Sequence, residues 1–277
     1  MQSHVFACAF GVAVACAQFA SAADKLRVAI GNAGVGESST TDLGKAAGFF
    51  ARRGLDIETT YTQGSAETIQ VLLSGGADIS VAVGTLGALA VYGKGAPIRV
   101  TGASFTGDSN MFLWVPANSP IRRVEETGGK TVAYSNAGSS SQMMVLEARK
   151  QFNVDMKPTA TGGGPATITQ VMSGQVDVGW SGAPFGVDLL EAGKIRMIMK
   201  ASDLTAMAGQ SSRVIVASLE DLGKRPDAHR RFMQAYRDTV DWLYTTPEGL
   251  KAYAEFVKLP EPIARRMLDE FLPRAAL

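Results

Sequence analysis

The sequence predicts an α/β protein with two similar lobes. Short apolar segments alternate with amphipathic helical segments along the chain, which is the pattern of a parallel sheet covered by helices. A helix, a Ser-Gly stop and a strand led by an aspartate occur twice, and the second copy follows the first by 99 residues. The 277 residues include 30 glycines, which suit the many tight strand-to-helix turns of such a fold.

The first strand and helix open a βαβ unit. Leu26–Ile30 is a short apolar run typical of a strand, and residues 31–42 form a loop rich in glycine and in residues that favour a helix N-terminus. We expect the helix that follows to end at Gly54, because glycine commonly ends helices. A second strand is predicted at Leu55–Glu58.

The repeat is clearest in the next helix and strand. Ser65–Ser74 predicts a helix with one apolar face, and Ala77–Val83 predicts a buried strand. Within this helix, Thr68-Ile69 recurs as Thr167-Ile168, and the same offset aligns further positions. These are Gly64 with Gly163, Ser74-Gly75 with Ser173-Gly174, Asp78 with Asp177, and Ile79 with Val178. Chance similarity between strand-helix units is the alternative, but the shared order along the chain favours two related lobes.

Two segments are predicted to cross between the lobes. Gly102–Pro120 alternates turn residues with the apolar strand Met111–Val115, which suits a first crossing, and Arg213–Ala217 suits the return. The strand Lys130–Tyr134 repeats the opening strand of the first lobe. From Pro226 the apolar residues recur with a helical period, and later prolines mark the starts of two more helices.

Residues 1–22 predict a secretory signal peptide. They contain no charged side chain, and the apolar run Val5–Ala17 ends before the cleavage signal Ala20–Ala22. A retained membrane anchor and lipidation at Cys16 are the alternatives. Both cysteines, Cys8 and Cys16, lie in this segment, so the mature chain has no thiol. Export without cysteine suits the bacterial periplasm.

Composition excludes several functions. The 27 Lys and Arg residues balance 26 Asp and Glu residues, so no net charge attracts nucleic acid at long range, and no nucleic-acid partner is expected. The mature chain has one histidine, His229, and no cysteine, which leaves no motif for a zinc site or a hydrolase triad. Gly31–Gly36 departs from the dinucleotide fingerprint, because Ser39 stands where a third glycine is needed. We therefore predict no catalytic residue, metal or cofactor.

Two strand ends carry residues suited to a ligand. Gly138–Ser141 follows a strand and opens a helix, so that backbone N–H groups and hydroxyls converge as in an anion or polar-headgroup site. Plain N-capping by serine is the alternative. Trp180 and Phe185 follow another strand, at the edge where α/β sheets bind ligands, and core packing is equally compatible with the tryptophan. Arg213 becomes a candidate counter-ion if the return crossing lies at this edge.

Segments spread over nearly the whole mature chain resemble the periplasmic solute-binding proteins of ABC importers, in particular the nitrate, taurine, alkanesulfonate and thiamine-pyrimidine binding family. They are Gly48–Phe50 with Gly54–Glu58, Ser74–Ile79, Ser119–Ile121, Gly129–Ala133, Gly162–Gly164 with Gln170–Gln175, and Phe232–Tyr236. The resemblance implies a type II periplasmic-binding-protein fold, in which each lobe is a mixed, mostly parallel sheet flanked by helices and the ligand cleft lies between lobes. The expected division is 23–104 for the first lobe, 105–217 for the second, and 218–277 for C-terminal helices that pack mainly on the first.

The resemblance also implies a function. In that family the lobes close on a small solute in the periplasm and deliver it to an inner-membrane permease. Here we expect a monomer, no enzymatic activity and a polar or anionic organic solute of the sulfonate, nitrate or pyrimidine class. The implied ligand contacts are Asn32, Ser39, Gly64, Ser65, Gly84, Thr85, Ser135, Ser139, Ser140, Trp180 and Ser181.

Two other functions remain open for this fold. A ligand-sensing module for a membrane receptor would keep the cleft and lose the permease. A thiamine-pyrimidine-synthase-like enzyme is the second alternative; such synthases use a cysteine-rich segment and histidines near iron, which the mature chain lacks.

Overall fold

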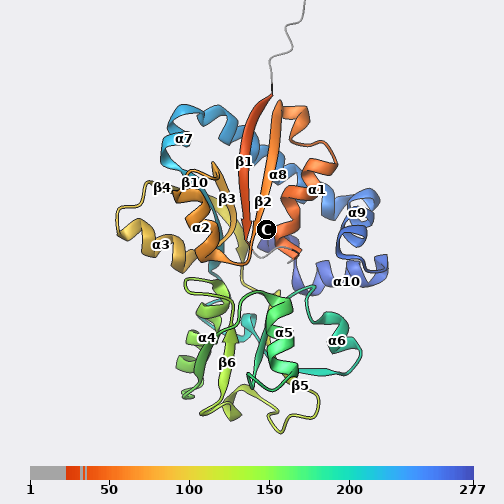
Figure 1. Ribbon diagram of the computed structural model, residues 1–277. Helices are drawn as coiled ribbons and strands as arrows, with labels where there is room; N and C mark the ends of the chain where they lie inside the picture. Colours follow the sequence, from red (N-terminus) through yellow and green to blue (C-terminus); the bar gives the residue numbers. More distant parts are fainter. Residues whose placement is uncertain (1–22, 32–33, 35) are drawn as a thin grey trace, which may run out of the picture.

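Two α/β lobes, joined by strands that cross between them, make up the structure (Figure 1). This computed structural model describes residues 23–31, 34 and 36–277 of the chain. The predicted signal peptide, residues 1–22, and the predicted contact Asn32 lie outside the described residues. None of the described helices is long and apolar enough to cross a membrane.

The first lobe is built on a five-stranded sheet of order β2-β1-β3-β10-β4. Strand β1 lies parallel to β2 and β3, whereas β10 is antiparallel to both of its neighbours, β3 and β4. Because β10 returns from the second lobe, it enters the sheet in the opposite direction. Four of the five strands therefore run in one direction and only β10 is reversed, which is the mixed, mostly parallel sheet that we expected. The strands are β1 (Asp24–Gly31), β2 (Leu55–Thr62), β3 (Ile79–Gly84), β4 (Ile98–Thr106) and β10 (Ser211–Ser218).

Helices cover both faces of this sheet. Successive strand residues point to opposite faces, so Val28 packs with Phe232 of α8 on one face, whereas Ala29 packs with Ile69 of α2 on the other. The helices of this lobe are α1 (Thr40–Ala46), α2 (Ser65–Leu73) and α3 (Thr85–Gly93), with α7 (Leu219–Lys224), α8 (Pro226–Thr245) and α9 (Pro247–Val257) from the end of the chain. Short 3-10 turns lie at Gly36–Ser39, Ala51–Arg53, Val124–Glu126, Ala201–Asp203 and Arg274–Ala276.

The second lobe combines antiparallel and parallel strands. Strand β5 lies between β8 and β9 and is antiparallel to both, while β6 is parallel to β7. A parallel bridge from Val132 to Val178, just before β8, connects the two groups of strands. The elements are β5 (Met111–Pro116), β6 (Thr131–Tyr134), α4 (Ser140–Gln151), β7 (Lys157–Ala160), α5 (Gly164–Met172), β8 (Gly179–Gly182), α6 (Val187–Glu191) and β9 (Ile195–Lys200).

The last helix, α10 (Glu261–Phe271), contacts both lobes. Ala264 and Leu268 pack with apolar residues of the first lobe and α9. Met267 and Phe271, on the adjoining face, belong to the core of the second lobe. The hydroxyl of Ser109 also donates a hydrogen bond to the carbonyl of Phe271 at 3.1 Å.

Two predicted boundaries need correction. The predicted second lobe, 105–217, contains most of β10, but this strand pairs with β3 and β4 and so belongs to the sheet of the first lobe. The first helix ends at Ala46 rather than at Gly54. Gly48 has a φ of 76°, which a helix interior does not allow, and a 3-10 turn then leads to Gly54. The predicted helix Ser65–Ser74 and the predicted strand Met111–Val115 match α2 and β5 closely.

Candidate functional site

Loops at the ends of strands from both lobes meet between the lobes. The backbone N–H of Gly87, in the first turn of α3, donates a hydrogen bond to the carbonyl of Gly138 at 3.1 Å. A Cβ atom on Gly84 would lie only 2.4 Å from that carbonyl oxygen. A Cβ on Gly138 would lie 2.8 Å from the Cα of Gly87. Backbone therefore touches backbone where the starts of α3 and α4 face each other.

A second pair of loops meets at equivalent positions of the repeat. A Cβ on Gly64 would lie 2.1 Å from the Nδ2 atom of Asn136 in the second lobe. A Cβ on Gly163, which is 99 residues later, would lie 3.1 Å from the Oε1 atom of Gln63 in the first lobe. Each glycine of the repeat thus faces the opposite lobe, so the repeated loops contact each other between the lobes.

The loop after β1 meets the loop after β8. The N–H of Gly36 donates to the carbonyl of Ala183 at 2.8 Å, and the N–H of Ala183 donates to the carbonyl of Asn110 in the first crossing at 2.9 Å. The Ser39 hydroxyl donates to the carbonyl of Gly36 within the same loop. Ser39 therefore lies beside this contact and supports its backbone.

The predicted serine contacts are already hydrogen-bonded within the protein. The Ser65 hydroxyl accepts from the N–H of Gly84 at 2.8 Å. The Ser141 hydroxyl lies 3.0 Å from the hydroxyls of both Ser135 and Ser139. Ser139 also accepts from the N–H of Gln142, so it is the N-cap of α4. The capping alternative is therefore observed, and the three hydroxyls form one cluster where α4 begins.

A buried charged pair lies next to this cluster. Arg213 of β10 pairs with Gly84 of β3, its side chain is 3% exposed, and its Nε donates to the Ser140 hydroxyl at 2.8 Å. Its Nη2 lies 3.9 Å from the carboxylate of Asp108. Burial lowers the pKa of Arg213 to about 9. The predicted return crossing therefore does bring Arg213 to the interlobe site.

Asp108 is a site residue that the sequence did not reveal. It lies in the first crossing with a φ of 48°, is fully buried, and accepts a hydrogen bond from the Ser212 hydroxyl. Its Oδ2 atom has no hydrogen-bond partner among the residues that the structure describes. Burial raises the pKa of Asp108 to about 7. In the sequence Gly107-Asp108 has the pattern of an ordinary turn. Only its contact with Ser212 in the return crossing identifies Asp108 as a site residue.

The family model described as NMT1/THI5 like matches residues 42–250, about three quarters of the sequence. The chain belongs to this family. No curated protein matches the sequence closely enough to count as a relative.

Solved structures share the fold of this NMT1/THI5-like chain. The alkanesulfonate-binding protein SsuA from Xanthomonas axonopodis pv. citri, bound to MOPS, is 19% identical with a TM-score of 0.78 over 91% of this chain and 86% of its own. The aliphatic sulphonate binding protein SsuA from Escherichia coli is 20% identical, with a TM-score of 0.71 over 90% and 79%. The nitrate-binding protein NrtA from Synechocystis PCC 6803 is 13% identical, with a TM-score of 0.70 over 87% and 68%. These similarities establish the two-lobed periplasmic-binding-protein fold.

In this NMT1/THI5-like chain Phe185 is an aromatic residue that lies between the lobes. A Cβ on Gly34 of the first lobe would lie 2.9 Å from the Phe185 ring, and Gly164 packs against its other atoms. Trp180 instead lies in the core of the second lobe and is 2% exposed. Ser181 accepts a hydrogen bond from the indole of Trp114 at 2.9 Å. The structure thus places Trp180 and Ser181 behind the interlobe surface.

The other predicted residues come together at the starts of α2, α3 and α4. They are Gly64, Ser65, Gly84, Thr85, Ser135, Ser139 and Ser140. The Thr85 hydroxyl donates to the carbonyl of Ser211 at 2.6 Å, which connects α3 to the return crossing.

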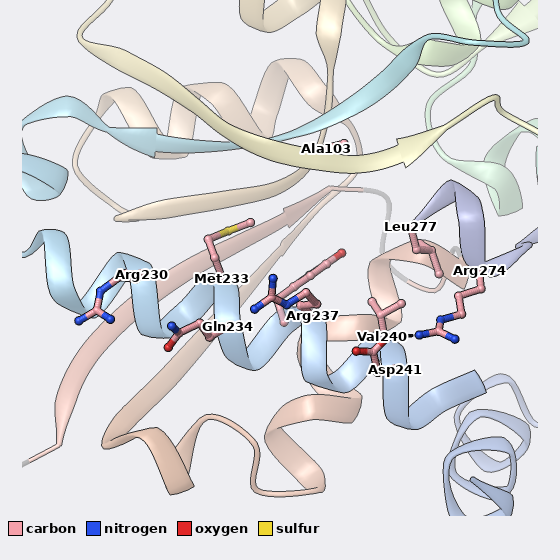
Figure 2. Close-up of a pocket in the computed structure, with 10 residues that line it drawn as sticks. Ala103, Arg230, Met233, Gln234, Arg237, Val240, Asp241, Arg274 and Leu277 are labelled. Carbon is pink, nitrogen blue, oxygen red and sulfur yellow. Dashed lines mark hydrogen bonds and ion pairs between the residues drawn. The ribbon is translucent and has the colours of Figure 1, made fainter. Parts of the chain in front are cut away.

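Two pockets lie near these elements, the first beside the interlobe contact at Phe185 and the second apart from it. One of about 610 Å³ adjoins Phe185 and lies between α5, α6 and the end of α9, with Lys258 and Asp188 on its walls. The other, of about 660 Å³, lies on the first lobe between α8 and β4, where Arg230, Arg237 and Arg274 surround an apolar floor (Figure 2). Among the described residues, no three His, Cys, Asp or Glu side chains lie close enough together to hold a metal ion.

Proposed function

We propose that this chain is the solute-binding component of an ABC importer. It captures a small polar or anionic organic solute between its lobes in the periplasm and delivers it to an inner-membrane permease. Membership of the NMT1/THI5-like family and the two-lobed fold support this function. It acts as a monomer, without catalytic residues or a cofactor.

The meeting of Arg213 with the start of α4 carries the proposal. The first turn of a helix presents unpaired N–H groups and the positive end of the helix dipole, which favour a negatively charged group. The guanidinium adds a buried positive charge from the opposite lobe, bonded to Ser140. Hydrogen bonds to charged groups are stronger when water is excluded. A solute anion bound here would contact both lobes and so favour their closed arrangement.

The solute class follows from this chemistry. A sulfonate, nitrate or carboxylate group suits a guanidinium beside helix N–H groups. The Xanthomonas protein of the same fold is bound to the sulfonate MOPS. A pyrimidine-like solute is the neutral alternative. The contacts that we propose are Asn32, Ser39, Gly64, Ser65, Gly84, Thr85, Ser135, Ser139 and Ser140, with Arg213 added. Trp180 and Ser181, which the sequence also suggested, lie behind the interlobe surface and are left out.

A thermal-shift screen tests the proposal. The protein is heated with sulfonates such as MOPS and taurine, with nitrate, with aromatic acids and with pyrimidines. A solute at 100 times its Kd adds about 2.7 kcal/mol to the free energy of unfolding, which raises the melting temperature clearly. No shift with any of these classes would contradict the proposed function.

Paired variants then locate the binding site. Arg213→Gln is expected to abolish the shift, and Ser140→Ala to weaken it while leaving the fold intact. Arg237→Gln removes an arginine from the pocket between α8 and β4 and is the matched control. Loss of binding in Arg237→Gln, with binding retained in Ser140→Ala, would place the solute in that other pocket instead.

A further inference from the structure

Three glycines form a close contact between the backbones of the two lobes. We call Gly84, Gly87 and Gly138 the glycine seam. A Cβ on Gly87 would lie 3.1 Å from the carbonyl oxygen of Gly138 and 3.5 Å from its Cα. A Cβ on Gly84 would lie 2.4 Å from the same oxygen and 3.0 Å from the Cα of Ser139. These neighbours are backbone atoms, which cannot turn aside as a flexible side chain can.

Two of these glycines are not required by their own conformation. Gly84 has a φ of −60° and a ψ of 128°, which any residue can adopt. Gly87 lies inside helix α3, where alanine forms a helix more readily than glycine. Neither residue has a positive φ. Within its own lobe a Cβ on Gly84 would meet the Ser65 hydroxyl at 2.9 Å, and a Cβ on Gly87 would meet the flexible end of Ile69 at 3.1 Å. The backbone atoms that either Cβ would meet belong to the opposite lobe, which approaches too closely for a side chain.

The glycine seam is connected directly to the proposed solute site. Gly138 lies two residues before Ser140, whose hydroxyl accepts the hydrogen bond from Arg213. Ser65, which bonds the N–H of Gly84, joins the seam to the start of α2. A methyl group at Gly84 or Gly87 would push the loop 138–140 away from the first lobe. The distance between Arg213 and the start of α4 would then increase.

We propose that the glycine seam sets how closely the lobes approach, and thereby how slowly a bound solute is released. This inference rests on the proposed function and names positioning residues that act on the solute through lobe closure. A methyl group at Gly87 meets the backbone of the opposite lobe only in the closed arrangement, because its neighbour in its own lobe is the flexible end of Ile69. It therefore destabilises the closed arrangement more than the open one. Solute therefore enters at an unchanged rate and dissociates faster.

The test compares two alanine variants in the same helix. Gly87→Ala places a methyl group at the seam, whereas Gly93→Ala, also in α3, places one where no atom lies within 4 Å. Both substitutions favour the helix, so both should keep or raise the melting temperature. Only Gly87→Ala should impair closure. Gly84→Ala, with its shorter contact to backbone, should impair it further.

Closure is first measured without any solute. Ala66→Cys and Asn136→Cys place thiols in facing loops, since the N–H of Ala66 lies 3.5 Å from the Oδ1 of Asn136. Cys8 and Cys16 are replaced by serine, which leaves this pair as the only thiols. A short bifunctional maleimide joins the two thiols only when the lobes approach. We expect Gly87→Ala to slow this cross-linking several-fold and Gly93→Ala to leave it unchanged. Equal rates in wild type and Gly87→Ala would overturn the proposal.

Dissociation of MOPS, followed by stopped flow, provides the second readout. Gly87→Ala should raise the dissociation rate about tenfold, the scale of an overpacked contact, with an unchanged association rate. An unchanged dissociation rate would also overturn the role of the seam. If MOPS and the other solutes fail to bind the wild type, the proposed function fails, while cross-linking still decides whether the seam controls closure.

Discussion

In each lobe an aspartate at the same position of the repeat binds the backbone of one strand, which is β1 in the first lobe and β6 in the second. In the first lobe the carboxylate of Asp78 accepts a hydrogen bond from the backbone N–H of Arg27 in β1 at 2.8 Å. In the second lobe the carboxylate of Asp177 accepts from the backbone N–H of Thr131 in β6 at 2.9 Å. The repeated aspartate therefore has the same structural role in both lobes.

A pair of threonines is repeated as well. In each lobe one threonine at a strand end shares a hydrogen bond of 2.6 Å with a threonine in the next helix, which also donates to a glycine carbonyl at that helix start. The residues are Thr62, Thr68 and Gly64 in the first lobe, and Thr161, Thr167 and Gly163 in the second. The helix is thus anchored to the preceding strand by the same bonds in both lobes.

The lobes differ in what surrounds this shared framework. The Asp78 side chain is 5% exposed and pairs with Arg27 and with Arg225, which immediately precedes α8. Asp177 is 42% exposed, and its other partners are the Thr131 hydroxyl and, at 3.9 Å, Lys130. The repeat thus specifies the hydrogen bond between aspartate and strand in both lobes. The C-terminal helices pack beside Asp78 and help to bury it, whereas Asp177 has no such cover in the described part of the chain and stays near solvent.

The largest expected difference between the lobes concerns these aspartates. Asp78→Ala should lower the free energy of unfolding by about 2–3 kcal/mol, because it removes the acceptor of the Arg27 backbone N–H and a buried carboxylate that pairs with Arg27 and Arg225. Asp177→Ala should cost about 1 kcal/mol, since water can replace the exposed carboxylate. Urea unfolding of both variants measures the difference. Equal losses would mean that burial by the C-terminal helices does not distinguish the two copies.

The threonine pairs should behave alike. Thr68→Val and Thr167→Val keep the side-chain shape and remove one buried hydroxyl each, so each should cost about 1–2 kcal/mol. The same urea titrations measure both variants. A loss confined to one lobe would break the structural equivalence that the hydrogen bonds indicate. Thr169→Val, at an exposed position of α5, serves as the control and should change stability little.

The smallest effect is the dependence on pH. Burial alone would raise the pKa of Asp78, but hydrogen bonds from the side chain and backbone of Arg27 and the charge of Arg225 lower it below its usual 3.8. The folded state therefore holds fewer protons on this group than the unfolded state. Its stabilisation is present above about pH 4 and is lost as the pH falls through the lowered value.

Acid titration of stability checks this sign. The stability difference between wild type and Asp78→Asn, measured by urea unfolding, should shrink as the pH falls from about 6 to about 2. Asp177→Asn should give a smaller change in the same direction, because Thr131 lowers the pKa of Asp177 despite the effect of burial. A difference that grows toward acid pH would contradict the assigned direction.

Much of the fold could be predicted from local patterns. The 99-residue echo follows from apolar periodicity and glycine stops, and it correctly identified Asp78 and Asp177 as equivalent residues. The direction of β10 could not be predicted, because Arg213–Ala217 is apolar enough for a buried strand in either lobe and its partners are far away in sequence. Strand pairing over such distances leaves no periodic signal.

The candidate site was predicted less completely for a related reason. Gly84, Ser139 and Arg213 lie where glycine, N-cap and crossing patterns indicated. Asp108 escaped notice because its burial depends on Ser212, which is 104 residues away in sequence. The sequence did not show whether Trp180 or Phe185 lies between the lobes, because both follow the same strand pattern. The answer depends on which face of β8 and of the turn after it points toward the first lobe.

Helix α10 has a consequence for how the lobes can separate. One face of this helix, with Ala264 and Leu268, is held by the first lobe, and the neighbouring face, with Met267 and Phe271, is part of the core of the second. A rotation of the lobes must therefore pivot close to this helix, since a pivot elsewhere would pull an apolar face into water. The lobes would then separate on the side away from α10, and under the proposed function a solute would enter from that side.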